Sequence, residues 1–161
     1  MDTEWGNFAV VTGTAAAALL GLLFVAISIR VDVIGRSVEL RNRAGQTLVL
    51  FGTALVIGIL LSLPGQSAQV LGIELIVLAG TTGTALMALD RRARAGERGE
   101  GIARVLDVVA PNTITSALLL VSGVILLFGA TIGLYVLVVP VLATLTGGVA
   151  SAWLFMTRVS E

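Results

Sequence analysis

Long apolar runs, separated by short polar or glycine-rich links, set the pattern of this 161-residue chain. A helix that crosses the hydrocarbon core of a bilayer needs about 20 predominantly apolar residues. The first runs predict transmembrane helices over residues 7–29, 45–63 and 68–89. Bacterial outer-membrane strands, the alternative, are about 10 residues long and alternate in polarity. These runs are longer and uniformly apolar, so they favour helices.

The last apolar run, residues 112–157, is about twice as long as one span requires at about 1.5 Å per residue. The chain must therefore fold back once within it. The glycine-rich stretch "GATIG", Gly129–Gly133, is the expected turn. It gives helices over residues 112–128 and 134–157. The pattern as a whole predicts an all-α, polytopic membrane protein with five transmembrane helices in a single domain.

Arginine placement predicts how these helices are oriented, because cytoplasmic loops carry an excess of basic residues. All ten basic residues are arginines, and they follow the first, third and fifth predicted helices. They are Arg30, Arg36, Arg41, Arg43, Arg91, Arg92, Arg94, Arg98, Arg104 and Arg158. The N-terminus, the "PGQSA" link and the "GATIG" turn carry none. Five spans place every arginine on one side, with the N-terminus outside and the C-terminus in the cytoplasm.

Two links on the arginine side carry apolar residues at helical spacing. The pattern in residues 30–43 and 101–112 suits a short helix in the headgroup layer in each link. They read equally well as cytoplasmic extensions of the adjoining helices, with an interruption at Pro111 in the second link.

Composition agrees with a membrane location and narrows the chemistry. The chain is 57% hydrophobic and only 12% charged, whereas a soluble domain carries about 25% charged residues. It has no cysteine, histidine or lysine. Thiol, imidazole and Schiff-base chemistry are therefore excluded, and no metal-ligand cluster or nucleophile–base pair can be named. The sequence therefore predicts no enzyme, no cofactor and no metal site. Because its net charge is zero, it also predicts no nucleic-acid partner.

Glu74 is the acidic residue that lies inside a predicted span. It lies about 9 Å from the expected helix start at Ala68, where a charged acid costs up to about 3 kcal/mol. Thr81 and Thr82 follow seven and eight residues later, so the three side chains are candidates to line a pore or polar site. The alternative is a helix that starts later, near Leu71 or Ile73, and leaves Glu74 among the lipid headgroups.

Small residues at four-residue spacing predict where helices approach closely, since association in lipid depends on such approach. The candidate packing residues are Gly13, Ala17, Gly21, Gly83, Gly147, Gly148 and Ser151. These stripes pack within one chain or meet a second subunit. Pro140 frees the carbonyl of Val136 and predicts a kink, which either shapes packing or acts as a hinge.

A resemblance to other membrane proteins rests on three stretches of the chain. They are the segment "AAAALLGLLFVAISI", the arginine-bearing link after it, and "LSLPGQ". Together these first 65 or so residues resemble a group of small, uncharacterised membrane proteins common in actinobacteria. Some of those proteins are labelled modulators of a membrane-bound AAA protease. The resemblance implies a multi-pass protein of the bacterial plasma membrane, and its residues contain no catalytic motif.

Two functions follow as hypotheses. One is a small homo-oligomeric ion channel or permeation protein, with the helix over residues 68–89 lining the path. The other is an accessory or scaffold subunit of a larger membrane complex, with the bilayer and other membrane proteins as its partners.

Overall fold

The computed structural model describes residues 3–29, 31–36, 38–95 and 102–159, and its side chains mainly over residues 5–91 and 113–153. Every element of these ranges is an α-helix, which confirms the predicted all-α class. The helices are α1 (Thr3–Ile29), α2 (Val31–Arg36), α3 (Val38–Leu61), α4 (Ala68–Ala95), α5 (Ile102–Leu127) and α6 (Ile132–Val159).

Four helices are long and apolar enough to cross a membrane, which supports the predicted membrane class. Their candidate spans are Trp5–Ile29, Leu40–Leu61, Ala68–Arg91 and Ile132–Ala150. The apolar part of α5 is shorter, Thr113–Leu127.

The helices extend beyond the apolar runs at the arginine-bearing ends. The second long helix begins at Val38 and not at residue 45, and the fourth begins at Ile102 and not at residue 112. Hydropathy detects the part of a helix that suits lipid, whereas backbone hydrogen bonds continue into water. The expected interruption at Pro111 is wrong, because α5 continues through it. The other link divides into the separate helix α2 and an extension of α3.

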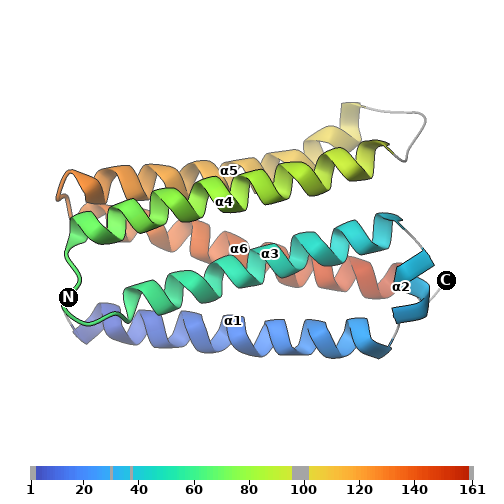
Figure 1. The fold of residues 1–161 in the computed structure, drawn as a ribbon, viewed down its shortest axis with the longest axis horizontal. Helices are drawn as coiled ribbons and strands as arrows, with labels where there is room; N and C mark the ends of the chain where they lie inside the picture. Colours follow the sequence, from blue (N-terminus) through green and yellow to red (C-terminus); the bar gives the residue numbers. More distant parts are fainter. Residues whose placement is uncertain (1–2, 30, 37, 96–101, 160–161) are drawn as a thin grey trace.

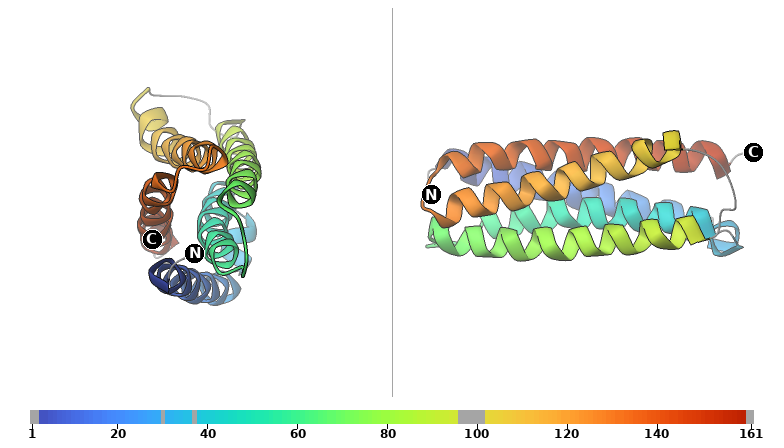
Figure 2. Two further views of the ribbon diagram at one scale, coloured as in Figure 1. Left: turned by 90° about the vertical axis from the view of Figure 1, so that its left-hand side faces the viewer. Right: turned by 90° about the horizontal axis from the view of Figure 1, so that it is seen from above.

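The five long helices run side by side along the longest axis of the molecule (Figure 1). The start of α1 and the α3–α4 and α5–α6 links lie at one end, which we call the Gln66 end. The opposite end carries α2 and is called the α2 end. Helix α3 contacts α1, α4 and α6, whereas α1 lies at one edge of the bundle and packs mainly on α3 (Figure 2). Among the four candidate spans, α1 is the least buried.

Glycine makes the two links at the Gln66 end possible. Helix α5 ends in a Schellman motif, in which Gly129 N donates to Leu126 O and Ala130 N donates to Ile125 O. This motif requires a left-handed residue, and Gly129 supplies it with φ of 78°. Gly65, after Pro64, has φ of 70° in the other link. The chain therefore reverses at the expected turn.

The helices approach most closely at pairs of glycines. A Cβ atom on Gly58 would lie 2.7 Å from Gly13 Cα, so α1 and α3 are in backbone contact there. Likewise a Cβ on Gly72 would lie 2.7 Å from Gly123 O, and one on Gly123 would lie 2.9 Å from Gly72 O. Helices α4 and α5 touch at that point. Without side chains between them, two backbones gain dispersion contacts along several turns.

Aliphatic side chains fill the bundle between these contacts. The main cluster joins α1, α3, α4, α5 and α6. Its members are Ala9, Ile57, Leu61, Leu71, Leu75, Ala79, Leu119, Leu126, Leu134, Leu137 and Val141. The centre of the bundle is thus closed by packed hydrocarbon.

We predict that Gly123→Ala destabilises the protein, because the added methyl group overlaps Gly72 O and Ile76. Overpacking of this kind lowers the free energy of unfolding by about 1–3 kcal/mol. The higher helix propensity of alanine offsets up to about 1 kcal/mol of this loss. Gly80→Ala is the matched control, since a Cβ at Gly80 meets open space. Unfolding in mixed micelles with increasing SDS measures both. Equal or higher stability of Gly123→Ala would contradict the glycine contact.

Candidate functional site

Glu74 lies in the second turn of α4. The helix begins at Ala68, where Ser67 Oγ accepts a hydrogen bond from Val70 N at 3.3 Å, so the later start near Leu71 or Ile73 is wrong. The Glu74 carboxylate accepts a hydrogen bond from Gln66 Nε2 in the α3–α4 link. Both side chains are half-buried. The link that precedes the helix therefore supplies the carboxylate with a donor.

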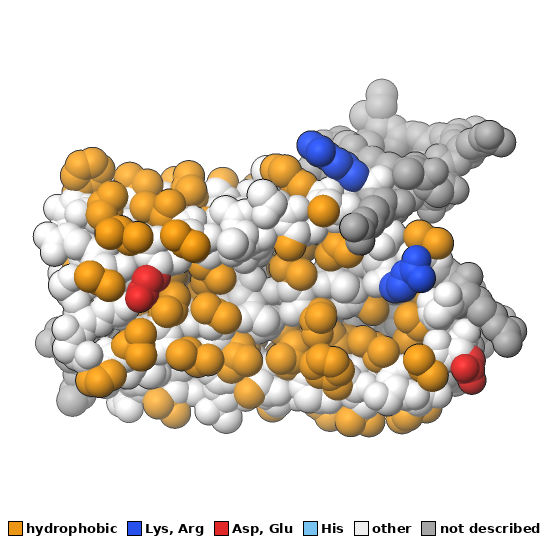
Figure 3. All heavy atoms as spheres, viewed as in Figure 1, with side chains coloured by type: hydrophobic (Ala, Val, Ile, Leu, Met, Phe, Trp, Pro, Cys, Tyr) orange, Lys and Arg blue, Asp and Glu red, His pale blue; other side chains and the backbone are white. Residues whose placement is uncertain are grey.

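The surroundings of Glu74 are apolar on both sides. Val70, Ile73 and Val77 of the same helix are 48–60% exposed, while Leu71 and Leu75 are almost fully buried. Glu74 thus lies at the boundary between the exposed face of α4 and the face that packs in the bundle. On the face shown in Figure 3, acidic side chains appear among hydrophobic ones toward the Gln66 end and again at the α2 end, where the basic side chains also gather.

Thr82 faces the interior of the bundle. It is 4% exposed, and its hydroxyl lies 3.0 Å from the Thr53 hydroxyl of α3. Thr53 donates its single hydroxyl proton to Val49 O at 2.7 Å, so Thr82 must be the donor between the two threonines. The pair is a closed polar bridge between α3 and α4.

Thr81 faces outward, unlike Thr82. It is exposed, and its hydroxyl is within 3.1 Å of the carbonyl oxygens of Val77 and Leu78 in its own helix. Within one chain, therefore, the structure does not bring the three candidate residues onto one surface. Glu74 and Thr81 belong to the outer side of α4, and Thr82 belongs to the core.

Other buried hydroxyls are satisfied nearby. Ser122 Oγ donates to Gly133 O at 2.7 Å and fastens α5 to the first turn of α6. Thr47 and Thr144 donate to carbonyls of their own helices. These bonds stabilise polar groups that lipid could not solvate.

The predicted packing residues fall into two groups. Gly13, Gly83 and Gly148 pack inside the chain, against Gly58, Ser116 and the Phe51 ring respectively. Ala17 and Gly21 are exposed on α1, and Cβ atoms at Gly21 and Gly147 would meet nothing within 4 Å. The Ser151 side chain lies outside the described residues.

Sequence reasoning missed Gln66 and the glycines Gly58, Gly72, Gly123 and Gly133. A signal existed for Gly58, because Ala54, Gly58 and Ser62 repeat at four-residue spacing. Gly123 lacks such a repeat and is recognised only from its contact with Gly72. Pro140 lies inside α6 and is almost fully buried. The kink expected there stays a prediction.

Aromatic rings gather at the Gln66 end. Trp5 of α1 stacks edge-on with Tyr135 of α6 at 5.1 Å between ring centroids, and with Phe8 at 5.8 Å. Such rings anchor helices at the membrane surface.

Comparisons with family models, curated proteins and solved structures find no match. The candidate site consequently rests on geometry alone. Over the described residues, no group of three acidic side chains is positioned to hold a metal ion.

We predict that Thr82→Val lowers the free energy of unfolding by about 0.6 kcal/mol, the average for hydrogen bonds between membrane helices. Valine keeps the shape and removes the hydroxyl that donates to Thr53. Thr81→Val is the matched control and should change stability by less than about 0.5 kcal/mol, because its hydroxyl bonds only within α4. SDS-induced unfolding measures both, and equal effects would contradict the bridge.

Proposed function

We propose that this protein is a small homo-oligomeric protein of the bacterial plasma membrane, with five spans, the N-terminus outside and the C-terminus in the cytoplasm. The end-to-end arrangement supports this orientation. The start of α1 and both glycine-containing links share the Gln66 end. The arginines whose side chains are described all lie at the α2 end of the bundle. They are Arg41 and Arg43 near the start of α3, and Arg91 near the end of α4. The apolar part of α5, Thr113–Leu127, is shorter than a full span. For α5 to form the fifth span, the part of the helix just before Thr113 must also lie within the membrane.

The exposed face of α4 supports self-association. Gly80, Thr81 and Thr84 are all exposed within a candidate span, and Glu74 lies on the border of the same face. Small residues permit close helix approach, and a carboxylate facing lipid is costly. Contact between copies through this face would remove that cost by placing Glu74 in a shared, hydrated space.

A permeation path would then run between copies and not through the bundle. The observation that carries this is the closed core: aliphatic side chains fill the centre, and Thr82 is bonded to Thr53. Glu74 and Thr81 would line the shared path near the Gln66 end. A carboxylate in that position attracts cations, so the proposed activity is cation permeation.

An accessory or scaffold subunit is the second candidate. The same closed core favours it, since a packed bundle with exposed small-residue faces also suits binding to a larger membrane protein.

We predict that single cysteines at Ser67 and Ala95 react from opposite sides of intact cells. Ser67 lies at the Gln66 end, which faces outside in the proposed orientation. Ala95 is the last residue of α4, at the α2 end, which faces the cytoplasm. A membrane-impermeant maleimide added outside should label only the cysteine at residue 67. Labelling of both from outside would refute the five-span orientation.

For assembly and permeation, we predict that the wild type forms a defined multimer in nanodiscs. At least one of Gly21→Leu, Gly80→Leu and Gly147→Leu should dissociate it, because each position has open space for contact with another helix. Ala117→Leu, on the exposed side of α5, is the control and should leave the multimer intact. Mass measurement of the intact assembly gives the outcome, and a monodisperse monomer would refute self-association.

Bilayer recordings then separate the two candidates. Glu74→Gln keeps the size of the side chain and removes its charge, so a channel should lose cation preference without losing its mass as a multimer. A multimer that conducts nothing, and that co-purifies with a membrane partner, would instead support the accessory subunit.

A further inference from the structure

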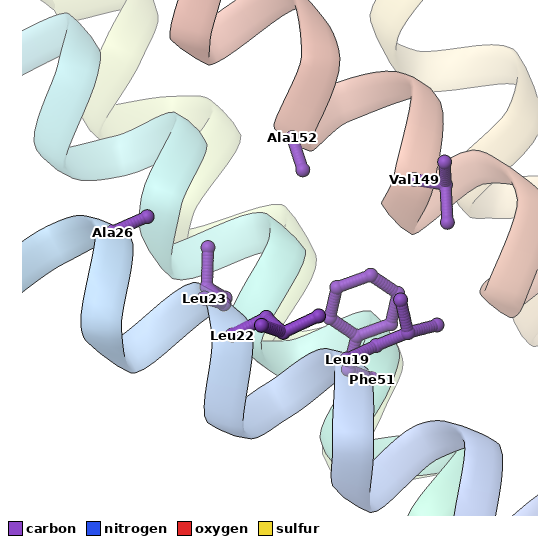
Figure 4. A pocket seen from close by; sticks show the side chains of 7 residues that line it. All are labelled: Leu19, Leu22, Leu23, Ala26, Phe51, Val149 and Ala152. Carbon is purple, nitrogen blue, oxygen red and sulfur yellow. The ribbon is translucent and has the colours of Figure 1, made fainter.

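An apolar groove separates α1 from α6 above the ring of Phe51. Its lining comes from three helices, and it has a volume of about 150 Å³. The lining residues are Leu19, Leu22, Leu23, Ala26, Phe51, Val149 and Ala152. Figure 4 shows these side chains pointing into the space between α1 and α6, with Phe51 reaching in from α3.

The groove lies toward the α2 end, away from the ring contact between α1 and α6. Trp5 and Tyr135 bring the two helices together near their first turns. The lining residues of α1 lie in its second half, toward the α2 end. The lining residues of α1 and Val149 of α6 fall within the candidate spans, so in a membrane this part of the groove would face hydrocarbon, whereas Ala152 lies just beyond the α6 span.

The floor of the groove is held in place by a glycine. A Cβ on Gly148 would lie 2.9 Å from both Cδ1 and Cζ of Phe51, so the ring lies directly on the α6 backbone. Phe51 is 1% exposed, and a larger residue at position 148 would push it away from α6.

We propose that this groove binds one acyl chain of an anionic phospholipid from the leaflet at the α2 end. The lining is entirely hydrocarbon, so the groove does not suit water. An apolar cavity of roughly this volume stays dry and takes a guest of about the size of benzene. That guest matches a segment of one lipid chain. A second helix, about 10 Å across, is too wide to enter.

Charge at the same end selects an anionic headgroup. Arg41 and Arg43 lie near the start of α3, the helix that supplies Phe51, and therefore at the end of the bundle toward which the groove lies. The guanidinium group of arginine pairs bidentately with phosphate. Trp153, one residue beyond Ala152, is 69% exposed, as is typical of side chains at the level of the headgroups. A chain in the groove would thus carry its phosphate toward arginines.

The test uses native mass spectrometry of the full-length protein, purified in mild detergent and incubated with either phosphatidylglycerol or phosphatidylcholine. Wild type should retain one phosphatidylglycerol per chain. Ala26→Leu and Ala152→Leu fill the groove and should reduce retention about tenfold through lost chain contacts. Ala18→Leu and Ala150→Leu are matched controls on the same two helices, both exposed outside the lining, and should retain lipid as wild type does.

A diazirine near the middle of the acyl chain gives an independent readout that does not depend on any variant folding. Cross-links should concentrate on peptides that contain Leu22, Ala26 or Val149. Equal retention by wild type and the filled variants, or cross-links spread evenly over α1 and α6, would overturn the proposal. Phosphatidylcholine retained as well as phosphatidylglycerol would overturn the anionic assignment, and a stable dimer that retains no lipid would replace the lipid with a second copy.

Discussion

Close backbone contact at glycines is the constraint on which the rest of this bundle depends. In lipid there is no hydrophobic force that drives one apolar helix onto another, so helices associate by dispersion contacts and a few hydrogen bonds. Gly13 with Gly58, and Gly72 with Gly123, bring two helix pairs to a separation that alanine at Gly58, Gly72 or Gly123 would not allow. Each pair lies on helices with extensive mutual contact, α1 with α3 and α4 with α5. The aliphatic core fills the space that these contacts define.

Polar side chains are arranged to suit that packing. Thr82 donates to Thr53 across the α3–α4 contact, and Ser122 donates to Gly133 O across the α5–α6 turn. Each bond joins two helices whose polar groups have no water available in the hydrocarbon region. Glu74 differs, because its donor is Gln66 of the link and not a partner helix. Glu74 is therefore a polar side chain of a candidate span that is not bonded to another helix of the bundle.

Hydropathy predicted the helical class and the turn at Gly129, because both follow from apolar length and from the left-handed residue that a Schellman motif needs. It misplaced the starts of α3 and α5, since amphipathic ends continue a helix outside lipid. The four-residue stripes found Gly13 and Gly148 but could not assign their partners. Thr81 and Thr82 were grouped as one polar track, whereas adjacent helix positions differ by about 100° and face opposite environments. Gln66 escaped notice because its role depends on how the link folds.

The position of α1 explains two features together. Its glycine contact with α3 occurs at Gly13, and its Trp5 ring contacts Tyr135 of α6. Toward the α2 end, Leu19, Leu22 and Leu23 line the side of α1 that faces the groove. The groove above Phe51 is the space left between the two helices. The opposite side of α1, with Ala17 and Gly21 exposed, keeps the small residues that a further helix could approach. Helix α1 thus has two distinct sides besides its contact with α3: one lines the groove proposed to hold a lipid chain, and the other carries small residues available to the proposed self-association.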